Sequence, residues 1–265
     1  LGPDHPRTLF CMGNLAPGYL QSGKLDLALP LLEESLRLTK ARLGPDHPDT
    51  SASINNLAMG YQDAGKLDLA LPLLEEAIRQ TKARFGPDHP NTLRMMCNLA
   101  LVLMDNNQSD RSIPLFLEVL SLQEKKFGRS HPETQGAVVG LGVNYLVAGR
   151  AEEAIPLLEE AYQSSKRHHF LRSYRPDLLE AYARAGKRAE AVKLLPEMLA
   201  DARRTHPKDS PQLAQELAPL GLALLQSEAF AEAEPLVREC LAIREKTQPD
   251  AWTTFNTQSL LGGAL

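Results

Sequence analysis

The stretch NLAPGYLQSGKLDLALPLLEE, at Asn14–Glu34, returns as NLAMGYQDAGKLDLALPLLEE at Asn56–Glu76. Over the whole 42-residue interval, the first copy and the second share 29 identical residues. Self-similarity at a fixed period is typical of repeat architectures, in which each copy is one small unit of secondary structure. The period therefore decides how the rest of the chain is divided.

The copies define the predicted domain organisation, which is one repeat array over 1–265. Because the chain begins at Leu1 inside a repeated phrase and without a methionine, we expect it to be part of a longer protein. Four copies are complete, the fifth is irregular and the seventh is partial. Their ranges are 1–42, 43–84, 85–126, 127–168, 169–204, 205–247 and 248–265.

Each copy has the periodicity of two helices. Met12, Leu15, Ala16 and Tyr19 follow the i, i+3, i+4, i+7 spacing of one apolar stripe, which predicts a first helix, called helix A. Gly23 ends it, and a second stripe predicts helix B. A single helical hairpin leaves its apolar stripe exposed, whereas stacked hairpins bury it between neighbours. The sequence thus predicts an all-α solenoid of about six and a half helix–turn–helix copies. The second stripe consists of Leu25, Ala28, Leu29, Leu32 and Leu36.

The phrase GPDHP opens the first three copies, at Gly2–Pro6, Gly44–Pro48 and Gly86–Pro90. Glycine and proline stop the preceding helix, and the last proline suits the first turn of the next helix A. Asp4 or His5 is then the predicted cap. Helix packing separates successive histidines by about 10 Å, whereas metal ligands lie about 2 Å from a shared ion. We therefore predict that the histidines are structural and bind no metal.

Composition excludes several classes of protein. The chain has 265 residues, is 43% hydrophobic and 23% charged, and carries a net charge of -4. These values are ordinary for a globular protein and show no chain-wide basic footprint, so we expect no nucleic-acid partner. No apolar run reaches the roughly 18 residues that span a bilayer, so we expect no membrane partner.

The three cysteines, Cys11, Cys97 and Cys240, form neither a CxxC motif nor an even set. This pattern indicates no disulfide framework or zinc site and favours a reducing cytoplasm. The sequence also contains no GxSxG, HExxH, P-loop or GxGxxG motif. We therefore predict a protein without catalytic activity and without a cofactor.

The pattern x-L-A-x-x-Y-x-x-x-G-K-x-x-x-A, seen at Asn14–Ala28 and Asn56–Ala70, resembles the tetratricopeptide repeat. The 42-residue spacing, with GPDHP and NLA, is similar to the long repeats of kinesin light chains and their bacterial relatives. The resemblance to the repeat pattern is strong over 1–168, fair over 205–247 and weak over 169–204. The resemblance implies a right-handed superhelix, with helix A lining a concave groove that holds an extended peptide or a partner helix. It implies no reaction.

A helical wheel identifies the face of helix A opposite its apolar stripe, and this face is the predicted groove. In the first copy it contains Phe10, Gly13, Asn14, Pro17 and Gln21. From it and its equivalents in the next three copies we select ten candidate groove residues. These are Asn14, Gln21, Asn55, Asn56, Asp63, Arg94, Asn98, Asp105, Val139 and Val143.

Asn14, Asn56 and Asn98 occupy one position in successive copies, although asparagine costs about 0.6 kcal/mol relative to alanine inside a helix. An amide both donates and accepts hydrogen bonds, so a row of amides suits an extended peptide backbone. The resemblance to kinesin light chains implies the same use. The alternative is that each amide tethers a neighbouring copy, and the sequence leaves both interpretations open.

Gly140 takes this position in the fourth copy, between valines that include Val139 and Val143. This apolar surface either seats one side chain of a ligand or packs against the irregular fifth copy.

A second candidate surface lies in 166–208, which holds eleven Lys and Arg against five Asp and Glu, an excess of six positive charges. It either attracts an acidic peptide or nucleic acid or forms a solvated outer face, and the absence of interleaved aromatic residues favours the second.

We predict a scaffold that binds a protein or peptide in the groove of helix A. The alternative is a regulatory module of a larger protein, such as a kinase or a transcription regulator, whose groove holds another domain of the same chain. The partial seventh copy, with SLLGGAL at Ser259–Leu265, leaves an apolar end that a second molecule can cover. Self-association through this end is a further prediction.

Overall fold

The computed structural model of the chain describes residues 12, 15–20, 22–45, 47–226 and 228–264. Every regular element in these ranges is a helix, and none is a strand, which confirms the predicted all-α fold. The chain forms two compact units, Leu1–Gly140 and Leu141–Leu265. The boundary falls inside one helix, α7.

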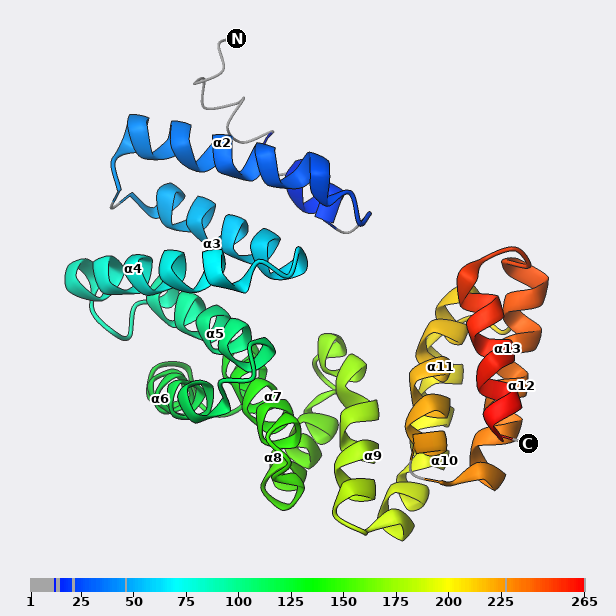
Figure 1. The fold of residues 1–265 in the computed structure, drawn as a ribbon. Coiled ribbons are helices and arrows are strands. Elements are labelled where there is room, and N and C mark those ends of the chain that lie inside the picture. Colours follow the sequence, from blue (N-terminus) through cyan, green and yellow to red (C-terminus); the bar gives the residue numbers. More distant parts are fainter. Residues whose placement is uncertain (1–11, 13–14, 21, 46, 227, 265) are drawn as a thin grey trace. The chain divides into compact units, whose positions relative to one another are not determined.

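The first unit repeats with the period of the sequence. Its helices, coloured blue to green in Figure 1, are α2 (Leu25–Leu43), α3 (Pro48–Asp63), α4 (Leu67–Phe85), α5 (Pro90–Asp105), α6 (Ser109–Phe127) and the first part of α7 (Pro132–Val147). Each helix A has 16 residues and each helix B has 19. Equivalent helices begin 42 residues apart, which is the period of the sequence.

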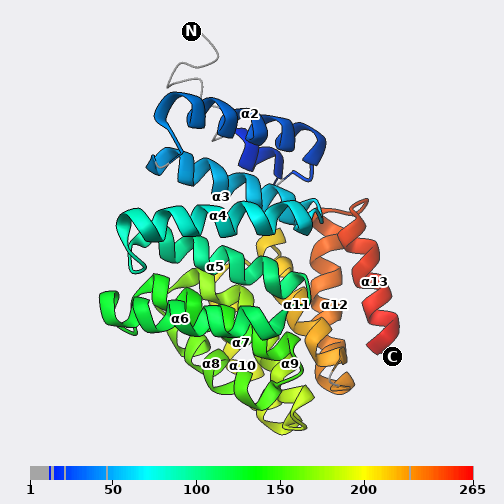
Figure 2. The same cartoon turned by 60° about the vertical axis from the view of Figure 1, so that its left-hand side comes forward.

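The second unit departs from the period. Its elements are α8 (Ala151–Ser164), the 3-10 helix η1 (His169–Tyr174), α9 (Arg175–Arg184), α10 (Arg188–Thr205), α11 (Pro211–Gln226), α12 (Phe230–Thr247) and α13 (Trp252–Ala264). Helix α8 has 14 residues where the first unit has 19, and η1 follows it. The fourth copy thus has a shortened helix B, and the irregular fifth copy begins with an inserted 3-10 turn. Within the unit, α11 lies beside α12 in the views of Figures 1 and 2.

The turn between helices A and B needs a left-handed residue. Gly23, Gly65 and Gly149 have φ angles of 68°, 67° and 75° at this turn. Only glycine adopts this conformation without steric cost, so the prediction for Gly23 is confirmed. In the third copy Asn107 takes the position with a φ of 55°. Asparagine tolerates the left-handed region better than other residues with a Cβ, which explains the exchange.

The GPDHP phrase ends one helix and caps the next. Gly86 has a φ of 91° after α4, and the Nδ1 atom of His89 accepts a hydrogen bond from the Asn91 N–H at 3.3 Å. His47 caps α3 in the same way, with 3.1 Å from the Asp49 N–H. The ring of His89 also stacks on Phe85, with centroids 4.8 Å apart. The structural role predicted for the histidines is confirmed in these copies, whereas Asp4 and His5 lie outside the described residues.

The apolar stripes form the core of each unit. Ala16, Leu57 and Leu99 are buried, as the stripe of helix A predicts. Leu15 is an exception, because its side chain is 48% exposed. In later copies the equivalent leucine packs between copies, and no described residue covers Leu15 in that way. None of the described helices combines the length and the apolar character needed to cross a membrane.

Candidate binding surface

Helix A of the first unit has neighbours on more sides than the helical wheel assumes. Helix α3 packs against α2 and α4, and it also touches the next helix A, α5. Its open face is therefore a narrow stripe, on which Met59 and Asp63 are exposed. On α5, Asp105 is exposed at the position that matches Asp63, and Arg94 is exposed near the start of the helix. These four residues form the open part of the surface predicted from the sequence.

The asparagine at the repeated position differs in role between copies. The Nδ2 group of Asn98 donates a hydrogen bond to Oδ1 of Asn55, whose side chain is buried. The Nε2 group of Gln62 donates to Asp105 at 2.6 Å. Both bonds join α3 to α5, so Asn98 acts as a tether between copies. Asn56 is half-buried, and its amide has no side-chain partner in the described part of the chain.

The ten candidates therefore fall into four groups. Asn14 and Gln21 lie outside the described residues. Asp63, Arg94 and Asp105 are exposed. The half-buried candidates are Asn56, Asn98 and Val143, and the buried ones are Asn55 and Val139.

The apolar seat expected in the fourth copy is not open. Val139 is only 1% exposed. A Cβ atom on Gly140 would lie 2.5 Å from Cε1 of Phe116, so this glycine faces helix α6. The first two copies hold Leu32 and Leu74 where the third holds Phe116. The larger ring fills the space that a side chain at Gly140 would occupy, and this packing explains why the asparagine is absent here.

A cysteine also lies on the predicted face. Burial, together with the charge of Glu133, raises the pKa of the Cys97 thiol to about 12. The thiol therefore stays protonated near neutral pH and is a poor nucleophile.

Two hollows lie between α9 and α11 of the second unit. One has a volume of about 510 Å³ and is lined by residues of η1, α9, α11 and the end of α10. The other has a volume of about 550 Å³ and lies toward the C-terminal ends of α9 and α11. Cavities of this size accommodate small ligands or side chains of a bound segment.

The hollows coincide with the helix A positions that the wheel identified in earlier copies. When Tyr182 is aligned with Tyr19, Glu180 and Arg184 match Pro17 and Gln21, and both line the second hollow. When Ala233 is aligned with Ala28, Pro219 of α11 matches Asn14, and it lines the first hollow. The same face of helix A is thus hollowed in the second unit.

A buried charge network forms one wall of the first hollow. Arg175, with a side chain 2% exposed, contacts Asp201 at 2.5 Å and Glu216 at 2.9 Å. Arg172 contacts Asp201 at 3.3 Å, and Nε2 of His206 lies 2.8 Å from Glu216. Burial opposes the charge of Asp201, but hydrogen bonds from Arg175 and Arg204 outweigh it and lower its pKa. The network joins η1, α9, α10 and α11.

Sequence reasoning identified the basic segment 166–208 but not this network. Most of its other cations are paired across the outer surface. Lys166 contacts Glu197 at 2.7 Å, and Arg203 contacts Glu239 at 2.5 Å. These exposed pairs agree with the solvated outer face that the composition favoured. The arginines that enter the cavity wall carry no sequence signal of their own, because their partners are 26 to 41 residues away.

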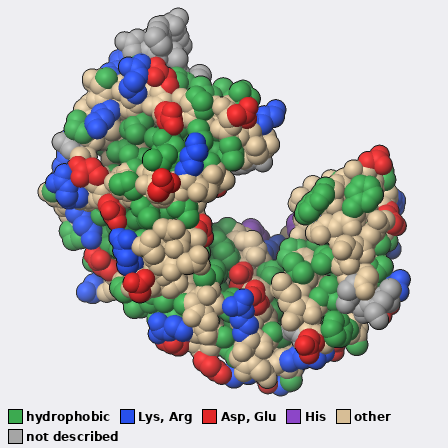
Figure 3. All heavy atoms as spheres, viewed as in Figure 1, with side chains coloured by type: hydrophobic (Ala, Val, Ile, Leu, Met, Phe, Trp, Pro, Cys, Tyr) green, Lys and Arg blue, Asp and Glu red, His purple; other side chains and the backbone are tan. Residues whose placement is uncertain are grey.

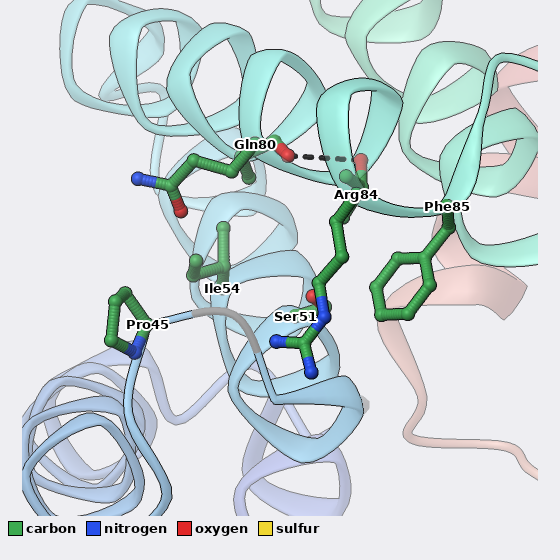
Figure 4. Close-up of a pocket in the computed structure, with 8 residues that line it drawn as sticks. Pro45, Ser51, Ile54, Gln80, Arg84 and Phe85 are labelled. Carbon is green, nitrogen blue, oxygen red and sulfur yellow. Dashed lines mark hydrogen bonds between the residues drawn. The ribbon is translucent and has the colours of Figure 1, made fainter.

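Two other surface features are weaker candidates. Figure 4 shows a depression between α3, α4 and the loop after α2, lined by residues such as Pro45, Ile54 and Phe85. Its cavity volume is about 0 Å³, so it is too shallow to hold a ligand. Figure 3 also shows hydrophobic side chains exposed at α13, where Trp252 and Phe255 are the exposed aromatic residues.

The repeat pattern, the paired helices and the open helix A face define a class of helical-repeat proteins. Three models described as tetratricopeptide repeat match the chain, at 18–83 and 49–125, at 97–168, and at 180–212 and 220–247. The chain belongs to the tetratricopeptide repeat family. Such repeats generally form non-catalytic surfaces for protein–protein interaction. No curated protein matches the chain.

Solved structures show the same fold. The TPR-like repeats of a kinesin light chain from Podosopora anserina are 25% identical to this chain, with a TM-score of 0.54. The match covers 92% of this chain and 98% of that one. BtubC (BKLC) from P. vanneervenii is 17% identical, with a TM-score of 0.51 and coverages of 92% and 83%. A Rap protein complexed with Competence and Sporulation Factor is 11% identical, with a TM-score of 0.65 and coverages of 97% and 76%.

Proposed function

We propose that this protein is a scaffold that binds an extended protein segment along the open face of its A helices. One observation carries the proposal: Glu180 and Arg184, which match positions of the helix A face in the first copy, line the second hollow, toward the C-terminal ends of α9 and α11. Repeat stacking requires apolar contacts between copies, but it does not require a hollow on the outward face. The recurrence at matching positions supports a role in recognition.

The first unit offers the chemistry that an extended segment needs. Asn56 presents an amide without a side-chain partner among the described residues, and Asp63, Arg94 and Asp105 expose charges of both signs on α3 and α5. An amide bonds to either group of a peptide backbone, while the charges select side chains. The Rap protein complexed with Competence and Sporulation Factor is a precedent for ligand binding on this fold.

The proposal is tested by selecting random peptides from a display library on the immobilised chain and measuring their affinity by fluorescence anisotropy. Asn56→Ala combined with Arg94→Ala is expected to weaken the selected peptides by about tenfold or more, which is about 1.4 kcal/mol. Arg79→Ala on α4 is the matched control, because Arg79 is exposed on a B helix. Equal weakening by the control, or an unchanged affinity of the double variant, would refute binding at this face.

Three finer predictions remain proposals. We infer one continuous right-handed array over 1–265, and a cytoplasmic location that the free thiols of Cys97 and Cys240 favour. In the alternative function, the face holds another domain of the same chain. This alternative predicts that a peptide selected on the isolated chain competes with that domain for the face when the domain is present.

A further inference from the structure

Four elements line the first hollow of the second unit, namely η1, α9, the end of α10 and α11. Its volume of about 510 Å³ lies within the range of pockets that hold small molecules.

The lining contains both apolar and polar groups. Pro176, Pro219 and Leu220 supply apolar surface from the two A helices. Arg172, His169 and His206 supply nitrogen atoms, and Ser173 and Thr205 supply hydroxyl groups. Pockets that orient small molecules commonly have this arrangement of an apolar wall and a few placed polar groups.

The charge network beside the hollow has more cations than anions. Asp201 contacts three guanidinium groups, those of Arg172, Arg175 and Arg204. Glu216 contacts Arg175 and His206. Arg204 is exposed to solvent and does not line the hollow, but among the lining residues Arg172 and Arg175 outnumber Glu216, so the lining carries one net positive charge. An anion in the hollow would balance this positive charge. Because the site is partly shielded from water, the attraction between the anion and the arginines would be stronger than at an exposed surface.

The polar wall is held in place before any ligand binds. Nη1 of Arg172 donates to Oγ1 of Thr205 at 3.0 Å, and Nη1 of Arg175 donates to Glu216 at 2.9 Å. His206 is held by Glu216 on α11. Fixed donors lose little conformational entropy on binding, so they contribute more to affinity than mobile ones.

We propose that this hollow binds a small organic anion, with its carboxylate or phosphate group beside Arg172 and His169 and its apolar body against Pro176, Pro219 and Leu220. The site is separate from the peptide-binding face proposed for the first unit. Failure of either proposal leaves the other standing, because their variants lie in different units.

The test is calorimetric titration of the whole chain with three probes. 3-Phenylpropionate carries both an apolar body and a carboxylate, 3-phenylpropan-1-ol lacks the charge, and inorganic phosphate lacks the apolar body. The acid is expected to bind in saturable fashion and at least about tenfold more tightly than either of the other two. Absence of saturable binding of the acid, or equal binding of the alcohol, would overturn the proposal.

Variants locate the binding. His169→Gln alters an exposed lining residue and is expected to weaken the binding of 3-phenylpropionate several-fold without changing the melting temperature. Arg172→Gln is expected to weaken this binding by about tenfold. Arg167→Gln is the control, since this exposed arginine does not line the hollow. Unchanged affinity in both lining variants would contradict the site. A capped glutamate peptide that binds more tightly than the free acid would assign the anion to a protein side chain and overturn the small-molecule proposal.

Discussion

Asn98 and Asn56 occupy the same position in neighbouring copies, yet the structure predicts opposite effects of replacing them by alanine. Asn98→Ala removes the donor to Asn55, whose side chain is only 5% exposed. A buried acceptor left without a partner costs about 1–3 kcal/mol. Alanine regains about 0.6 kcal/mol of helix propensity. The variant should therefore lose about 0.5–2.5 kcal/mol of unfolding free energy.

Asn56→Ala is the matched control, because this amide has no side-chain partner in the described part of the chain. Only the propensity gain applies, so the variant should be about 0.6 kcal/mol more stable than the parent. Asn55→Ala combined with Asn98→Ala removes both ends of the tether. It should cost less than the sum of the two single changes, because neither partner is then left unsatisfied.

Urea unfolding followed by circular dichroism measures all four variants. Each kcal/mol should also shift the melting temperature by about 2–4 °C in a protein of this size. Shifts of the same sign for Asn56→Ala and Asn98→Ala would refute the distinction between a tether and an open amide. Strict additivity of Asn55→Ala and Asn98→Ala would show that the two amides do not interact.

Three further predictions concern packing, charge and capping. Gly140→Ala should cost about 1–3 kcal/mol because its Cβ meets Phe116 at 2.5 Å; recovery on adding Phe116→Leu in urea unfolding would confirm the clash, and no recovery would contradict it. Burial raises the pKa of Asp177 from 3.8 to about 6, and the charge of Glu180 adds to the effect. The folded chain then holds the proton more tightly than the unfolded chain, so this group's contribution to stability falls as the pH rises from about 4 to 7. Asp177→Asn should gain up to about 3 kcal/mol at pH 7 and little at pH 4, and equal unfolding midpoints of parent and variant at pH 7 would disprove this. His89→Ala removes the cap of α5 and should cost about 1 kcal/mol in thermal unfolding, whereas an unchanged midpoint would show that the Nδ1 bond contributes nothing.

The repeat period predicted the helices of the first unit because stacking and turn residues are local. Gly23 and Gly65 set the turn, His47 and His89 set the cap, and each acts on atoms within a few residues of itself. The second unit was harder to predict. Arg175, which directly follows η1, contacts Asp201 and Glu216, and both are distant in sequence. Periodicity carries no information on such contacts.

Of the residues that the helical wheel assigned to the outward face, Asp63, Arg94 and Asp105 are exposed, whereas Val139 is buried. A wheel sees one helix and one apolar stripe, whereas a stacked helix A also meets the preceding helix B and the next helix A. The residues at the edge of the predicted face are therefore covered. Asn55 and Val139 lie one position before the asparagine column, where this cover begins.

That column shows how one repeat supports different surfaces. It is filled in turn by Asn56, Asn98, Gly140, Asp177 and Pro219. One of these residues tethers a neighbouring helix, one makes room for a phenyl ring, one is a carboxylic acid with a raised pKa, and one lines a cavity. Stacking needs only the apolar positions, so the column is free to vary without loss of the fold. The chemistry of the column changes between the first unit and the second. A segment that binds to the amide and the charges of α3 and α5 will therefore not fit the hollow between α9 and α11, and the two units should select different ligands.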